Sequence, residues 1–196
     1  MLNKILRISD KKSPYFWDYL NTLRASILGA NDGIISVSGI VLGVTGANLG
    51  SQALFISGVS GMLAGACSMA GGEWMSVSTQ RDLQLKTIEE QKDLSRCQNC
   101  PVKLKSSDLL MPLHAACMSF ASFIFGALIP LLAITFSIPR FRIMNTVVAM
   151  SLSLSLNAII STYNTNISTL KTLFRNNITG FATILITFIL GVIFST

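Results

Sequence analysis

The sequence predicts an all-α integral membrane protein whose chain crosses the bilayer as five transmembrane helices. Of its 196 residues, 51% are apolar and only 12% are charged, whereas a soluble domain carries about 25% charged residues. Charged residues are nearly absent from five stretches of 20 to 29 residues, each with no more than one Asp, Glu, Lys, Arg or His. A transmembrane helix needs about 20 such residues. This composition excludes a soluble enzyme and a nucleic-acid-binding protein.

The first two spans are expected at about 25–47 and 53–79. Before them, residues 1–24 mix basic and apolar side chains ahead of an aromatic group at 15–19. This pattern predicts a cytoplasmic or interfacial arm. The alternative is a plain linker that leads to the first helix. After them, residues 80–108 form a cytoplasmic connection. Its segment QRDLQLKTIEEQKDL predicts one solvated helix that continues the second span. A residual ion-collecting role for Glu89, Glu90 and Asp93 is the alternative.

The remaining spans are expected at about 109–137, 143–163 and 177–196. His114 follows a Met-Pro pair at the start of the third span, which is typical of an interfacial residue. In the fourth span polar residues alternate from Ser151 to Asn157, but 21 residues without charge favour a helix over a strand. Those polar side chains either bond between helices or line water.

The basic residues predict the orientation of the chain. Thirteen of the 15 Lys and Arg residues lie in the arm, in the connection after the second span, or in the segment after the fourth span, and only two lie in the turn around residue 140. Cytoplasmic segments carry such an excess. The N-terminus is therefore expected in the cytoplasm and the C-terminus outside or in a lumen.

Two carboxylates lie within the predicted spans, Asp32 in the first and Glu73 in the second. An acidic residue inside the bilayer is costly, and it marks a functional site by default. Glu73 shares one helical face with Met69 and with other residues at steps of four and three, namely Met62, Ala66, Ser76 and Gln80. A thioether and carboxylates can hold Fe²⁺ or Mn²⁺. The alternatives are that Met69 only fills space and that Glu73 reaches interfacial water.

Small residues line both of these spans. The second carries a stripe at Gly61, Gly65, Ser68 and Gly72, next to the Met69–Glu73 face. In the first span Gly29 and Gly33 flank Asp32 at a spacing that lets helices approach closely. The sequence Asn-Asp-Gly there is a poor helix interior. Unwound backbone at this position would be tolerated only if it were buried in protein or lined a wet cavity.

A cysteine pair in the connection supports a different function. Cys97 and Cys100 form RCQNCP, which supplies half of a tetrahedral zinc site. The pair is a candidate metal or redox site, although a reducing cytoplasm disfavours a structural disulfide. If these thiols are the functional ligands, the chain is a membrane metal sensor that does not transport.

These motifs also carry a family resemblance. RASILGANDGIISVSGIVLGV followed by AGACSMAGGEWMSVSTQRDLQL resembles the first two spans of the vacuolar iron transporter family, carriers of iron and manganese. SFASFIFGALIPLLA is similar to the third span, and RNNITGFATILITFILGVI more loosely to the fifth. The resemblance covers all five spans and is most specific in the first three.

The resemblance implies a homodimer of five-helix subunits with an ion path at the dimer interface, and export of Fe²⁺ or Mn²⁺ from the cytosol in exchange for protons. The metal ion is then cargo, and no prosthetic group is expected. In that family, the aspartate of the ANDG block and the methionine of the SMA block line the path. In this chain they correspond to Asp32 and Met69. Glu73 lies toward its cytosolic mouth.

The chain departs from the family pattern in two places. Many members insert a helical domain rich in metal-binding glutamates between the second and third spans, where this chain has only the 29 residues 80–108. The polar fourth span replaces a more apolar helix that contains glycine. A short chain of this kind suggests the plasma membrane of a prokaryote; in a eukaryote the same topology would face a vacuole lumen.

Overall fold

The fold is a bundle of long helices, as the sequence predicted. A computed structural model describes residues 16–93, 109–163 and 168–195. In chain order these residues form α2 (Phe16–Gly46), α3 (Ser51–Asp93), α4 (Pro112–Phe136), the short η2 (Pro139–Phe141), α5 (Arg142–Thr162) and α6 (Thr169–Ile193). Within this described part, five helices are long and apolar enough to cross a membrane. The all-α membrane fold class is thereby confirmed.

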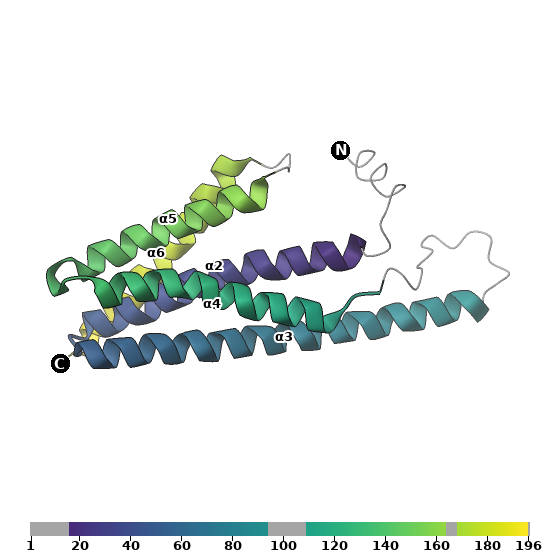
Figure 1. Ribbon diagram of the computed structural model, residues 1–196, viewed down its shortest axis with the longest axis horizontal. Coiled ribbons are helices and arrows are strands. Elements are labelled where there is room, and N and C mark those ends of the chain that lie inside the picture. The colour runs from purple at the N-terminus through teal and green to yellow at the C-terminus, as the bar shows by residue number, and fades with distance from the viewer. Residues whose placement is uncertain (1–15, 94–108, 164–167, 196) are drawn as a thin grey trace.

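Three helices extend well beyond the expected spans, and one of them, α6, begins at Thr169 instead of near residue 177. α2 begins at Phe16 and so includes Arg24, which the sequence had assigned to the arm. α3 has 43 residues and runs without a break through the charged segment to Asp93, so that its end projects past the rest of the bundle (Figure 1). Glu89 and Glu90 are exposed on this extension. The charged segment is therefore a continuation of the second span.

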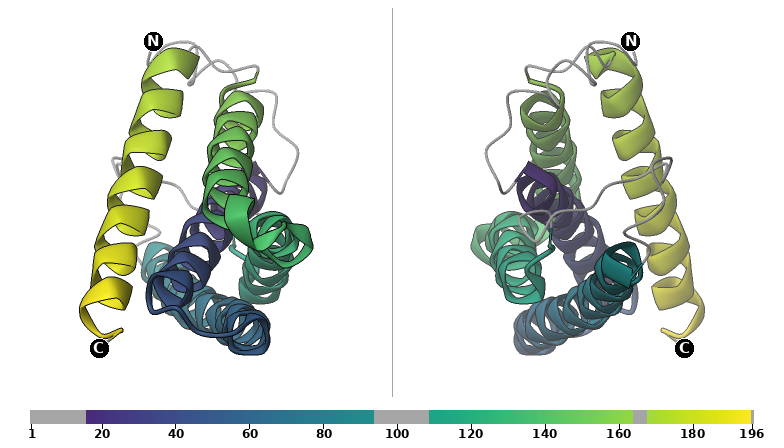
Figure 2. Two further views of the ribbon diagram at one scale, coloured as in Figure 1. Left: turned by 90° about the vertical axis from the view of Figure 1, so that its left-hand side faces the viewer. Right: turned by 90° about the vertical axis from the view of Figure 1, so that its right-hand side faces the viewer.

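α2 is the central helix of the bundle. It contacts α3, α4, α5 and α6, whereas α3 packs mainly on α2 and α4, and α6 mainly on α2 and α5. Seen along the bundle, α3 and α6 lie on different sides of α2 (Figure 2). The buried core lies where α2, α3 and α4 meet, around Val37, Ala66 and Phe123. Many large apolar side chains remain exposed on the outer faces, as expected where lipid is the solvent.

The helix α2 stays regular through Asn31, Asp32 and Gly33, although this sequence is a poor helix interior. The reason is close packing against α4. A Cβ on Gly33 would overlap the main-chain carbonyl of Phe123, and one on Gly126 would overlap that of Ala30. The two backbones touch because both helices present glycine, as small-residue faces in membranes allow. This contact holds the turn that carries Asp32 in helical geometry.

Candidate ion path in the membrane

Asp32 lies on an open face of α2. Its side chain is exposed, and Leu28, one turn earlier, is 45% exposed. The hydroxyl of Ser36 donates a hydrogen bond to Asp32 Oδ1 at 2.8 Å. Both of these neighbours belong to α2, so the packing of the single chain does not cover this carboxylate.

Met69 lies at the same depth as Asp32. α2 and α3 run antiparallel, and two contacts fix their register: Arg24 meets Glu73, and Ile40 meets the position of a Cβ on Gly61. Asp32 is midway between Arg24 and Ile40, and the midpoint of Gly61 and Glu73 falls two residues before Met69. The Met69 side chain is half-buried and packs against the central core. The structure thus brings the two predicted ligands to one level of the bundle.

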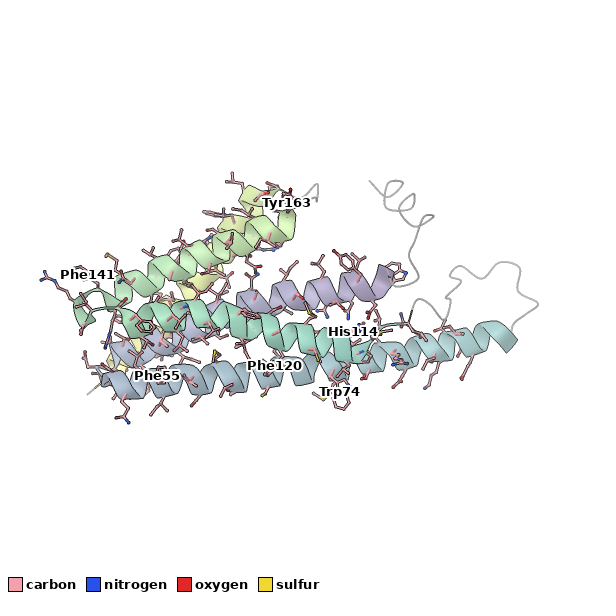
Figure 3. The ribbon with its side chains drawn as sticks, in the orientation of Figure 1. Phe55, Trp74, His114, Phe120, Phe141 and Tyr163 are labelled. Atoms are coloured by element: carbon pink, nitrogen blue, oxygen red, sulfur yellow. The ribbon has the colours of Figure 1, made fainter. Side chains whose placement is uncertain are left out.

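Glu73 is buried and paired. Its side chain is 8% exposed, and its Oε2 lies 2.7 Å from Nη2 of Arg24 on α2. Trp74, the next residue, points away from the bundle and is 56% exposed (Figure 3). Exposed tryptophans of membrane proteins gather at the water interface. Glu73 therefore lies near one end of the membrane-spanning region, roughly 10 Å from the level of Asp32 by the rise of a helix.

The glycine stripe on α3 divides into two parts. A Cβ on Gly61 would meet Ile40, and one on Gly65 would meet the ring of Phe123, so both glycines face the interior. Ser68 is exposed, and a Cβ on Gly72 would meet nothing within 4 Å. The part of the stripe nearer Glu73 is consequently free of contacts within the chain.

A second polar contact between helices, which the sequence did not reveal, lies farther from Asp32 than Glu73 does. Asp18 on α2 is buried at 7% exposure, and it accepts a hydrogen bond from the Met111 main-chain N–H at 2.7 Å. Its other oxygen lies 3.3 Å from Nδ1 of His114, at the start of α4 (Figure 3). The expected interfacial histidine is thus part of a contact between helices. The only signal was an acidic residue within an aromatic segment.

Three of the four alternating polar residues of the fourth span, Ser151, Ser155 and Asn157, bond to other helices, whereas Ser153 donates to the Ala149 carbonyl of its own helix. Ser151 donates to the amide oxygen of Asn177 on α6 at 2.7 Å. The amide of Asn157 donates to Asn31 Oδ1 at 2.8 Å and to the Ile27 carbonyl at 3.3 Å. Of the two readings that the sequence left open, bonding between helices accounts for these side chains. Asn31 precedes Asp32 in the chain, so these hydrogen bonds hold the turn of α2 that carries Asp32 against α5.

A complete metal site does not occur within the described residues, which contain no cluster of three or more His, Cys, Asp and Glu side chains. Asp32 and Glu73 lie too far apart along the bundle to bind one ion together. Each can bind an ion in turn as it moves along the bundle, and the Met69 thioether lies near the level of Asp32. Cys97 and Cys100, the alternative candidates, lie outside the described residues.

Comparison with known proteins agrees with the resemblance of the motifs. The family model for the VIT family matches residues 23–103 and 100–192. Vacuolar iron transporter homolog 2 of Arabidopsis thaliana is 38% identical over 133 residues, which are 67% of this chain and 63% of that protein. Vacuolar iron transporter homolog 5 of Oryza sativa subsp. japonica is 43% identical over 136 residues, 69% and 62% of the two chains.

VIT-like transporter 1b of Glycine max is 37% identical over 141 residues, 70% of this chain and 62% of that protein. In each case the chain spans only about three fifths of the length of the curated relative that it matches.

Proposed function

The chain belongs to the VIT family, and from this premise we propose that it transports Fe²⁺ or Mn²⁺ out of the cytosol in exchange for protons. It is a multi-pass integral membrane protein, and the relatives that it resembles are named as iron transporters or VIT-like transporters. The ion enters near Glu73 and passes to Asp32 and Met69. Protons move in the opposite direction.

One observation carries this proposal: an exposed carboxylate lies at the level of a thioether in the middle of a membrane helix. Asp32 has a neutral hydroxyl as its hydrogen-bond partner, so no cation from the described part of the chain compensates it. A carboxylate in this setting gains from either a proton or a metal ion, because both remove its charge. Alternate binding of the two at one group couples their gradients.

A second copy of the chain is expected to cover the open face. An exposed carboxylate facing lipid is costly, and a two-fold partner would bring a second Asp32 to the same region, since such an interface uses the same patch on both subunits. The exposed Ser68 and the uncontacted Gly72 offer a smooth surface for this approach. A shared path also supplies the ligands that one subunit lacks.

The excess of basic residues supports an orientation with the arm and the connection after α3 in the cytoplasm. In this orientation the Glu73 end of the path opens to the cytosol. The same arrangement serves a prokaryotic plasma membrane or a vacuole-type membrane.

Flux into liposomes tests the proposal. Purified protein is reconstituted with a metal-quenched dye inside, Mn²⁺ or Fe²⁺ is supplied outside, and a pH gradient is imposed. We expect quenching that follows the proton gradient and disappears in Asp32→Ala. Asp82→Ala removes an exposed carboxylate from the extension of α3 and serves as the matched control with normal flux. Normal flux in Asp32→Ala would refute the site, and no flux from folded wild-type protein would favour the sensor function of Cys97 and Cys100.

A further inference from the structure

The ion pair between Arg24 and Glu73 occupies the place where cargo is proposed to enter. Arg24 Nη2 lies 2.7 Å from Glu73 Oε2 and bridges α2 and α3. A guanidinium at this distance satisfies a carboxylate as a metal ion would. We propose that Arg24 is a tethered competitor for the cation position of Glu73, and that a divalent ion binds there by displacing it. This inference rests on the proposed function, because it assumes that Glu73 meets the cargo.

The two partners differ in where they can go when the pair opens. The Arg24 side chain is 51% exposed, whereas that of Glu73 is 8% exposed. A half-exposed arginine can extend its charged group along its apolar stem toward the water interface. Glu73 has no such freedom, and a buried carboxylate without a cation is strongly disfavoured. Opening therefore requires that a proton or another cation neutralise Glu73, and a divalent ion does so while also carrying the cargo.

Arg24 also has a second partner on its own helix. The same Nη2 atom donates to Oδ1 of Asn21 at 3.2 Å. Asn21 precedes Arg24 by three residues, so the two side chains lie on one face of α2. When Arg24 leaves Glu73, the contact with Asn21 can be kept while the rest of the guanidinium faces water. The displaced state thus retains one of its two hydrogen bonds.

Displacement also links cargo binding to the helices that carry the deeper ligands. Arg24 belongs to the helix of Asp32, and Glu73 belongs to that of Met69. The ion pair ties these helices together at the Glu73 end of the path. When a metal ion bound to Glu73 replaces Arg24, the ion pair between α2 and α3 is broken and the ion can move on toward Asp32. A singly charged ion gives Glu73 no more charge than Arg24 already does, so the competitor also selects for divalent cargo.

A binding experiment tests this competition without requiring transport. Mn²⁺ is titrated into the detergent-purified full chain, and free Mn²⁺ is followed by its electron paramagnetic resonance signal. We expect Arg24→Gln to bind Mn²⁺ roughly tenfold more tightly than wild type, because a charged hydrogen bond no longer competes. Arg24→Lys keeps the charge and stays within about threefold of wild type. The gain disappears in Arg24→Gln combined with Glu73→Gln. Unchanged affinity in Arg24→Gln, or a gain that survives in the double variant, overturns the proposal.

The native chain offers a second measurement that does not depend on a variant folding. Phenylglyoxal modifies accessible arginines, and mass spectrometry reads each site. We expect Mn²⁺ to increase the modification of Arg24 and to leave exposed Arg140 unchanged. Decreased or constant modification of Arg24 contradicts displacement. If Mn²⁺ binding and arginine modification both change as expected while liposome flux is absent, displacement of Arg24 is supported and the transport function is wrong. If flux is normal while neither measurement changes as expected, transport is supported and displacement of Arg24 is wrong.

Discussion

The two carboxylates within the membrane helices occupy opposite environments. Glu73 is buried, and it is paired across a helix boundary with Arg24. Asp32 is exposed, and its hydrogen-bond partner Ser36 lies on the same helix. Glu73 therefore contributes to holding α2 and α3 together, while Asp32 contributes little to the packing of its own chain. A charge kept in the membrane without a packing role indicates function, which makes Asp32 the stronger candidate for the central ligand.

The largest effect that the comparison predicts is a difference between the two halves of the ion pair. Arg24→Met leaves Glu73 buried without a cation, and we expect a loss of about 3 kcal/mol of stability. Glu73→Gln leaves Arg24 half exposed, and the loss should be about 1 kcal/mol. Unfolding in detergent measures both values. Equal losses would mean that water reaches Glu73 when Arg24 is removed, so that Glu73 would differ less from the exposed Asp32.

The packing behind Asp32 gives the next effect. Gly33→Ala places a methyl group against the Phe123 carbonyl, and we expect a loss of about 2 kcal/mol from overpacking. Gly72→Ala is the matched control: a Cβ there meets nothing within 4 Å, so stability in a single chain should change by less than about 0.5 kcal/mol. Similar melting of the two variants would contradict the direct contact of α2 with α4.

Sequence reasoning succeeded where the signal was local to one helix. Charge-free stretches predicted the membrane helices. Spacing predicted that Ala66 and Glu73 share a face, and both are buried, although Ser76 and Gln80 at the end of the same face are exposed. It could not decide the outcome where two helices meet. Asn31-Asp32-Gly33 has poor helix propensity, yet contact with the α4 backbone keeps it helical. Tertiary packing outweighs propensity in such a case.

The ion pair shows the same limit at the candidate site. Arg24 was counted with the cytoplasmic arm, because nothing in the sequence says that its side chain turns toward α3. Pairing across helices depends on register, and the register of α2 on α3 follows from contacts such as Ile40 with Gly61. Asp18 was missed for the same reason, since its partners lie more than 90 residues away.

A smaller effect tests how firmly the turn next to Asp32 is held. Asn157→Leu removes the hydrogen bonds to Asn31 and to the Ile27 carbonyl. Each hydrogen bond between membrane helices contributes about 0.6 kcal/mol on average, so we expect the two together to cost about 1 kcal/mol of stability, with flux reduced but present. A loss above about 2 kcal/mol would show that this network supports the fold as strongly as the Arg24–Glu73 pair.

The smallest effect on stability is expected at the carboxylate most important for function. Asp32→Asn keeps a side chain of the same shape, and an amide oxygen can still accept the hydrogen bond from Ser36. No contact with another helix is lost, so the unfolding free energy should change by less than about 0.5 kcal/mol, or rise, because a charge leaves the membrane. Proton-driven Mn²⁺ flux should nevertheless vanish. Measured together on one preparation, a stable but inactive Asp32→Asn separates cargo binding from folding, whereas a destabilised one would show that Asp32, like Glu73, has a structural partner.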